Sequence, residues 1–211
     1  MLGVKIVEQK RYQVVFEVAG PAAIFTRPDS GATPISYPIP TFSAAKGMFE
    51  AVAKYKSAYI RPTKVEICKP IRFEKYVTNY GGPLRHPNQI KKKAAYQLPA
   101  TILVEVCFRL YGIVEEVASA PNGNNHLHAL QAMFIRRLKK GQTYYTPVLG
   151  WKEFVPSYFG PLREGITFVQ KDINQIIPSL LHSVFDQPIS GKYKPVFRQN
   201  VEIREGVLEY A

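Results

Sequence analysis

The strongest constraint on the fold of this 211-residue chain is a long alternation of apolar and polar side chains that begins at Pro99. Its apolar positions recur at every second residue, at Ile102, Val104, Val106, Phe108 and Leu110. Successive side chains of a β-strand point to opposite faces, so this spacing places all five on one face. The segment therefore predicts a long strand that buries one side against a core.

Before this strand, the pattern predicts a strand, a helix and a second strand. Residues 11–18 alternate in the same way, and the alternation ends at Gly20-Pro21. A helix is expected to begin near Thr41 or Ser43, because either hydroxyl can accept a hydrogen bond from a free amide of the first turn. Residues 64–73 then predict a second strand.

After the long strand, the pattern predicts a helix and a further strand. Apolar residues recur at helical spacing at Leu127, Leu130, Phe134 and Leu138, and Gly141 is expected to end this helix. Residues 144–154 predict the next strand. The order of these elements favours an α+β fold, a modified ferredoxin-like (RRM-like) domain.

Between the second strand and the long strand lies a basic stretch, residues 61–96. It holds nine cations against only Glu66 and Glu74, which accounts for +7 of the chain's net charge of +12. The cations are Arg61, Lys64, Lys69, Arg72, Lys75, Arg85, Lys91, Lys92 and Lys93. Residues 78–83 give a turn signal, so we interpret the stretch as a long basic hairpin arm. Lys and Arg suit phosphates while Tyr can stack on bases, which favours RNA over the alternative of a merely solvated surface.

The C-terminal part has a weaker pattern. Residues 173–185 predict a short helical segment that Pro178 interrupts, and residues 197–208 predict one or two strands. We therefore expect a ferredoxin-like RNA-binding domain over residues 1–158, with its arm at about residues 74–98. A small β-rich C-terminal extension is expected over residues 159–211.

Bulk properties narrow the class of partner. A pI near 9.7 indicates nucleic acid or an anionic membrane surface. No apolar run approaches the roughly 20 residues of a membrane span, and the first residues show no signal peptide, so we expect no membrane partner. Cys68 and Cys107 have no Cys-x-x-Cys partner, which predicts buried thiols in a cytoplasmic protein and neither a metal nor a cofactor.

Several segments resemble the CRISPR-associated "Cas-five" family, subtype I-C (Dvulg). They occur in the family's order over roughly residues 10 to 155. The segments are GPAAIFTRP (20–28), SYPIPT (36–41), SAAKGMFE (43–50), KPI (69–71), MFIRRLKKGQ (133–142) and PVLGWKEF (147–154).

The resemblance implies a function. Members of the family bind the 5′ handle of CRISPR RNA and cap one end of the Cascade surveillance complex. In subtype I-C they also cut the repeat of the precursor transcript without metal. The implied partners are CRISPR RNA, other Cascade subunits and, as an additional candidate, double-stranded DNA.

The family's catalytic residues are Tyr, Lys and His, and this chain departs from that pattern. Ala53 stands at the tyrosine position, with Tyr55 two residues later. No lysine adjoins His126 or His128 at the start of the second helix. The catalytic candidates are therefore His126, His128 and Tyr55, with Lys46 and Arg137 as supporting cations.

The candidate RNA-binding residues share a positive charge and lie in the arm or at helix positions. They are Lys46, Arg72, Lys75, Arg85, Lys91, Lys92, Lys93, Arg136 and Arg137. The alternative for His126 and His128 is that they flank a helix without a catalytic role, and they diverge too far on a helix to form a metal pair. Tyr37, Phe42 and Tyr55 are candidates for base stacking or for packing. A subunit that only holds the handle, and an unrelated RRM-like protein, are the alternative functions.

Overall fold

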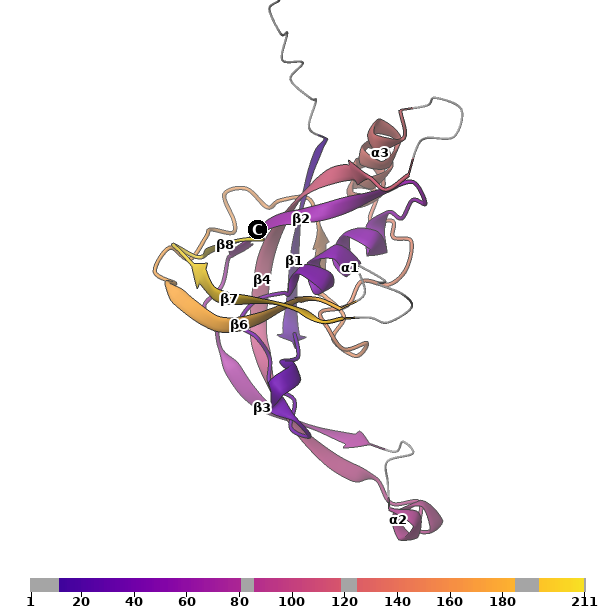
Figure 1. Cartoon of the computed structure of the whole chain (residues 1–211), viewed down its shortest axis with the longest axis vertical. Coiled ribbons are helices and arrows are strands. Elements are labelled where there is room, and N and C mark those ends of the chain that lie inside the picture. The colour runs from indigo at the N-terminus through magenta and orange to yellow at the C-terminus, as the bar shows by residue number, and fades with distance from the viewer. Residues whose placement is uncertain (1–11, 81–85, 119–124, 185–193, 211) are drawn as a thin grey trace, which may run out of the picture.

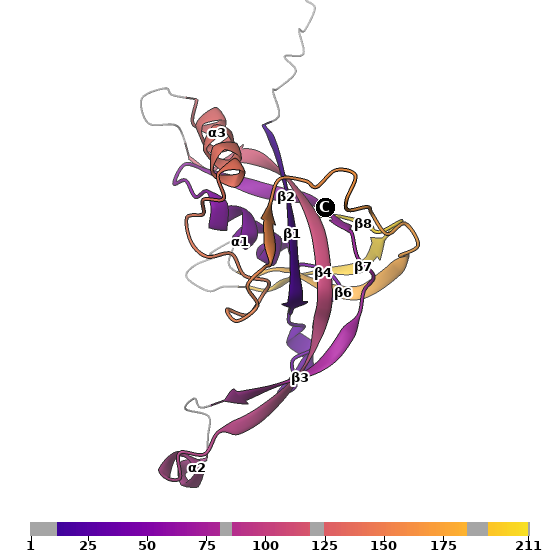
Figure 2. The same cartoon turned by 180° about the vertical axis from the view of Figure 1, so that it is seen from behind.

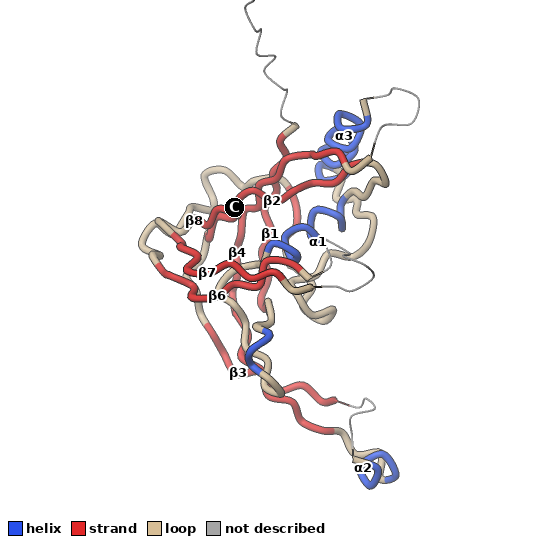
Figure 3. Tube along the Cα trace, in the orientation of Figure 1, coloured by secondary structure: helices blue, strands red, loops and turns tan. Residues whose placement is uncertain are grey.

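The computed structural model describes residues 12–80, 86–118, 125–184 and 194–210 (Figure 1). Its helices and strands are coloured by type in Figure 3. In order they are β1 (Gln13–Ala23), the 3-10 turn η1 (Pro28–Ser30), α1 (Phe42–Val52), β2 (Ala58–Ile67), β3 (Phe73–Tyr80), α2 (Pro87–Lys91), β4 (Tyr96–Glu116), α3 (His126–Lys139), β5 (Tyr158–Gly160), β6 (Gln175–Ser183), β7 (Val196–Ile203) and β8 (Val207–Glu209). None of the described helices has the length and apolar character needed to cross a membrane.

The main sheet is antiparallel and is built around β4. Its strand order is β5-β1-β4-β2-β8, and β3 also pairs with β4. Phe108 of β4 lies opposite Val18 of β1 and Ile67 of β2, so the predicted long strand occupies the centre. A separate antiparallel pair, β6-β7, lies beside this sheet (Figure 1). The predicted α+β class is confirmed.

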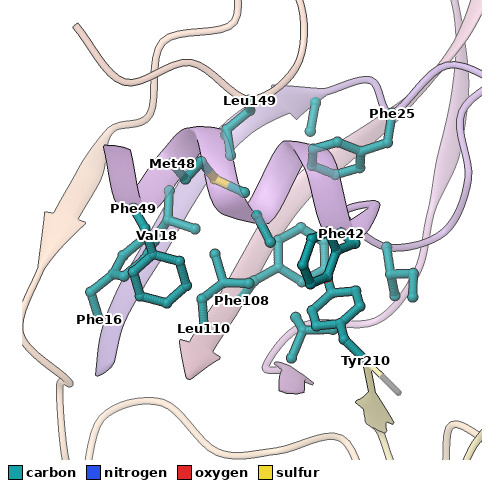
Figure 4. Packing of buried hydrophobic residues seen from close by; sticks show 14 of the residues in the cluster. Phe16, Val18, Phe25, Phe42, Met48, Phe49, Phe108, Leu110, Leu149 and Tyr210 are labelled. Carbon is teal, nitrogen blue, oxygen red and sulfur yellow. The ribbon is translucent and has the colours of Figure 1, made fainter. Parts of the chain in front are cut away.

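The two long helices cover one face of the sheet, and an aromatic cluster fills the space between the layers. The ring of Phe16 in β1 packs edge-on against Phe49 of α1, with centroids 4.9 Å apart, and 6.1 Å from Phe134 of α3. Figure 4 shows Phe16 and Phe49 beside Phe108 and Leu110. The helix begins as predicted, because the Thr41 side chain accepts a hydrogen bond from the Ala44 amide at 3.2 Å.

The basic arm projects from one end of the molecule (Figures 1 and 2). Its two strands are β3 and the first part of β4, paired from Phe73 opposite Leu103 to Tyr80 opposite Tyr96. The short helix α2 lies at its far end. Arg85 and the rest of residues 81–85 fall outside the described residues.

Two predicted elements are wrong. Residues 144–154 contain no strand; they form a loop, and the strand that completes this side of the sheet is β5. The loop turns at Gly150, which has a φ of +100° and lies against the backbone of Ile24. The segment predicted as helical, residues 173–185, contains no helix over its described part, residues 173–184, since β6 occupies most of it. Pro178 fits there because β6 pairs with β7 on one side only.

The C-terminal strands predicted within residues 197–208 are present as β7 and β8. β8 extends the main sheet beside β2. After β8, the ring of Tyr210 packs against Phe42 of α1. The Tyr210 hydroxyl donates to the carbonyl of Pro40 at 2.7 Å, and burial raises the pKa of this phenol. The C-terminal residues are thus part of the packed structure.

Replacing Gly150 by alanine is expected to destabilise the fold by about 3–5 kcal/mol. An added Cβ would lie 1.7 Å from the carbonyl oxygen of Ile24, in a backbone conformation that is strained for any L side chain. Chemical unfolding measures the loss. Gly47→Ala is the matched control: nothing lies within 4 Å of its Cβ, and a helical glycine replaced by alanine should gain roughly 0.5–1 kcal/mol. Equal unfolding midpoints for the two variants would contradict this account of the loop.

Candidate nucleic-acid interface and cleavage site

The arm presents its cations to solvent. Lys75, Lys91, Lys92 and Lys93 are exposed, and among the described residues none forms an ion pair with a carboxylate. The backbone amide of His86 donates to the Gln89 side chain at 2.9 Å, which fixes the start of α2 and brings the three lysines to its end. Uncompensated charge on a projecting hairpin is available to a polyanion.

A groove of about 850 Å³ lies at the base of the arm. Phe73 and Thr101 of the arm form one side of it, and Phe197 and Ile176 of the β6-β7 pair form the other. Phe73 and Phe197 are 44% and 41% exposed, which is high for aromatic side chains beside a core. Lys75 is two residues after Phe73 and so projects from the same face of β3. An exposed ring next to a cation is a platform for a nucleobase and its phosphate.

A second polar cluster surrounds the start of α3. Asn125 caps the helix by accepting a hydrogen bond from the His128 amide at 3.0 Å. Its side-chain amide donates to the Tyr12 hydroxyl at 2.7 Å. The rings of Tyr12 and His128 have centroids 6.0 Å apart. The cap therefore positions a phenol and an exposed imidazole together at one helix end.

His126 lies at the same end of α3 but is only 7% exposed. Its Nε2 atom is 3.7 Å from a carboxylate oxygen of Glu116, and in the described part of the chain this nitrogen has no hydrogen-bond partner. A buried polar atom without a partner costs free energy, so such atoms in folded proteins call for an explanation. When His126 is protonated, the nearby carboxylate supplies a counter-charge.

The remaining predicted site residues are more dispersed. Tyr55 is 39% exposed in the connection between α1 and β2, and within the described residues no hydrogen bond or ring contact joins it to His126 or His128. The Lys46 ammonium lies over the Tyr59 ring at 5.1 Å. Arg137 donates to the carbonyl of Val52 at 2.9 Å and so ties α3 to the end of α1. Arg72 and Arg136, two further candidate RNA-binding residues, are exposed.

Two of the candidate stacking residues pack inside the protein. Tyr37 is 4% exposed, its hydroxyl accepts a hydrogen bond from the Leu181 amide at 3.1 Å, and burial raises its pKa. Phe42 is 7% exposed and stacks on His182 with centroids 4.1 Å apart. Their packing interpretation is confirmed. Local sequence patterns do not identify Tyr12, Phe73 and Phe197 as site residues, because their positions depend on contacts between distant segments of the chain.

The chain resembles known proteins over most of its length. Residues 13–167 match the family model Cas_Cas5d, described as CRISPR-associated protein (Cas_Cas5). A relative from Thermus thermophilus, named CRISPR pre-crRNA endoribonuclease Cas5d, is 31% identical over 92% of this chain and 89% of its own length. A protein of the same name from Mannheimia succiniciproducens is 25% identical over 93% of this chain and 94% of its own.

Two solved structures share the fold. A crystal structure of a CRISPR-associated protein superposes with a TM-score of 0.68 at 18% identity, covering 94% of this chain and 91% of that one. A chain of a CRISPR RNA-guided surveillance complex gives a TM-score of 0.53 at 17% identity, covering 93% and 90%. The fold is thus that of CRISPR-associated proteins. The family match and the Thermus relative are more specific, and this chain belongs to the Cas5d family.

Proposed function

We propose that this chain binds CRISPR RNA and cuts the precursor transcript within its repeat. Two relatives of this chain are each named CRISPR pre-crRNA endoribonuclease, and this name supports precursor CRISPR RNA as the substrate. The exposed lysines of the arm support a polyanionic ligand. Membership of the Cas5d family removes the alternative of an unrelated RRM-like protein.

In this proposal the arm and the groove at its base hold the 5′ handle of the RNA. A modified ferredoxin-like core, residues 1–158, carries them, and the strand order β5-β1-β4-β2 supports that core, with β5 (Tyr158–Gly160) at its boundary with the C-terminal extension. The C-terminal extension, residues 159–211, supplies the β6-β7 wall of the groove. Other Cascade subunits are further partners, as the likeness to a surveillance-complex chain suggests, and double-stranded DNA is an additional candidate.

Cleavage without metal requires acid–base groups. The 2′-hydroxyl beside the scissile phosphate attacks phosphorus, a base accepts its proton, and an acid protonates the departing 5′-oxygen. His128 is exposed and anchored at its amide by the Asn125 cap, and we assign it one of these two roles. His126 lies at the same helix end, but its ring is buried beside Glu116, so we assign it no contact with the phosphate. The exposed imidazole of His128, whose ring centroid lies 6.0 Å from that of Tyr12, is the observation that carries this assignment.

The second acid–base group is a tyrosine, and two are candidates. Tyr12 is hydrogen-bonded to the helix cap and contacts His128, whereas Tyr55 lies apart in the α1–β2 connection. We expect Tyr12→Phe to slow cleavage by about 10²-fold and Tyr55→Phe to leave it unchanged, because only the first removes a hydroxyl beside the imidazole. Single-turnover assays at saturating protein measure both. The reverse order of effects would return the role to Tyr55.

The experiment that tests the proposed function is incubation of the purified protein with end-labelled repeat hairpin RNA in excess EDTA. A single discrete cut supports a metal-independent endoribonuclease. Tight binding with intact RNA supports the alternative, a non-catalytic subunit that holds the handle. The alanine at the family's tyrosine position, Ala53, and the lack of a lysine beside His126 favour this alternative.

The groove at the base of the arm is expected to contribute to RNA affinity by stacking. Phe73→Ala should weaken the binding of single-stranded repeat RNA by roughly 5–100-fold, because one stacking platform is lost. The dependence of affinity on salt should not change, since no cation is removed. Fluorescence anisotropy titrations at several salt concentrations measure both quantities. Val77→Ala, on the same face of β3 and also exposed, is the matched control and is expected to bind like the unmodified protein.

A further inference from the structure

Cys68 and Cys107 lie side by side, although 38 residues separate them in the sequence. The register of β2 and β4 pairs Ile67 with Phe108, so Cys68 falls opposite Cys107. The Cys68 amide donates to the Cys107 carbonyl at 2.8 Å. Directly opposed, hydrogen-bonded residues have Cα atoms about 5.5 Å apart, which is within the range that a disulfide spans.

Cys68 and Cys107 are buried, with 5% and 1% of their surface exposed, but they border a cavity that can hold a small molecule. They line a cavity of about 550 Å³ together with Ser157, Arg163 and Thr167. The cavity lies on the face of the sheet opposite to α1 and α3, because Cys107 alternates with the core residues Val106 and Phe108.

Charged groups around the cavity distinguish the two sulfur atoms. A guanidinium nitrogen of Arg163 is 3.9 Å from the Cys107 sulfur. Arg163 is held there by Glu17, which is fully buried and accepts its Nε–H at 2.6 Å. The neighbouring Cys68 thiol lowers the pKa of the Cys107 thiol, and the pKa of Cys68 is raised in turn, while burial and Glu17 oppose the effect on Cys107. Cys107 is therefore the sulfur that loses its proton first and attacks an oxidant.

We propose that Cys68 and Cys107 form an oxidation site, at which a peroxide converts the thiol pair into a disulfide. This disulfide would link β4 to the end of β2 at the base of the arm. Residues 69–106, which the bond would enclose, comprise β3, α2 and the first half of β4. The bond would thus join the two points where the arm leaves the sheet. This inference rests on the two strands alone and stands whether or not the chain cuts RNA.

The reaction consumes one molecule of hydrogen peroxide. The Cys107 thiolate attacks one peroxide oxygen, the O–O bond breaks, and hydroxide leaves and takes up a proton to become water. The product is a sulfenic acid on Cys107. The Cys68 sulfur then attacks the Cys107 sulfur, the S–O bond breaks, and a second water leaves with the Cys68 proton. Two thiols are oxidised, and peroxide is reduced to two waters.

The test is a peptide map of the folded protein after exposure to hydrogen peroxide. The protein is then unfolded in the presence of N-ethylmaleimide, which blocks the remaining thiols, and is digested with trypsin. Cleavage after Lys64, Arg72, Lys93 and Arg109 releases residues 65–72, with Cys68, and residues 94–109, with Cys107. The expected product is these two peptides joined, with a mass two hydrogens below their sum, and separated by reductant. Two N-ethylmaleimide adducts, or sulfinic acid on Cys107 without a linked product, would overturn the proposal.

Thermal unfolding provides a second measurement. A bond that closes a loop of this length should raise the unfolding midpoint of the oxidised protein by about 5 °C, and reductant should reverse the rise. Cys68→Ser and Cys107→Ser keep the shape of the site but cannot form the bond, so peroxide should not raise their midpoints. A rise of equal size in either variant would show that the shift has another origin.

Discussion

His128→Ala is expected to lower the rate of precursor RNA cleavage by about 10²–10⁴-fold while RNA binding stays close to that of the unmodified protein. The imidazole is exposed at the start of α3 and is the titratable group beside Tyr12, so its loss removes a proton-transfer group. The helix cap should survive, because Asn125 accepts from the backbone amide of residue 128 and not from its side chain. Single-turnover cleavage and equilibrium binding, measured on the same repeat RNA, separate the two effects.

His86→Ala is the matched control for this variant. His86 is also an exposed histidine at the start of a helix, but it lies in the arm, far along the chain from α3. At saturating protein its cleavage rate should equal that of the unmodified protein. If His128→Ala cleaved at the same rate as His86→Ala, the start of α3 would not be the cleavage site. Cleavage lost together with binding would instead indicate that residue 128 holds the RNA.

The sequence patterns predicted the central strand β4 correctly but not the loop formed by residues 144–154. The alternation around Val106 and Phe108 marked the long strand correctly, because β4 buries one face along much of its length. The segment 144–154 has comparable apolar content but turns at Gly150 against the backbone of Ile24. Periodicity reflects the burial of one face and not a close backbone approach, so it predicts a strand where the chain forms a loop.

Only those features of the site that lie within one short segment of the chain could be predicted from the sequence. The helix beginning at His126 and the exposed lysines of the arm follow from spacing and charge along a short segment. The contact between Asn125 and Tyr12 joins residues 113 positions apart. Phe73 and Phe197 line one groove because a hairpin from the other end of the chain packs near the arm. Such contacts result from tertiary packing and leave no local signature. The same holds for Cys68 and Cys107, which the register of two strands brings together.

Neutralising the lysine cluster of the arm, with Lys91, Lys92 and Lys93 all replaced by glutamine, is expected to weaken RNA binding by about 50-fold at 0.15 M salt. Each phosphate contact on single-stranded RNA contributes a slope of about 0.7 to the plot of log affinity against log salt concentration. Three lost contacts should therefore reduce the slope by about 2. The change in slope is the more diagnostic quantity, because it counts released counterions and is insensitive to a general loss of folded protein.

A charge-matched variant distinguishes a local contact from the overall field. Replacing the exposed Lys152, Lys171 and Lys194 by glutamine removes the same charge from positions outside the arm. Long-range attraction is screened beyond about 8 Å at this salt concentration, so this variant should retain nearly all of its affinity and slope. Equal losses in both variants would mean that the arm acts only through the net charge. A loss confined to the first variant would place RNA phosphates on the end of α2, where the three lysines lie together at the far end of the arm.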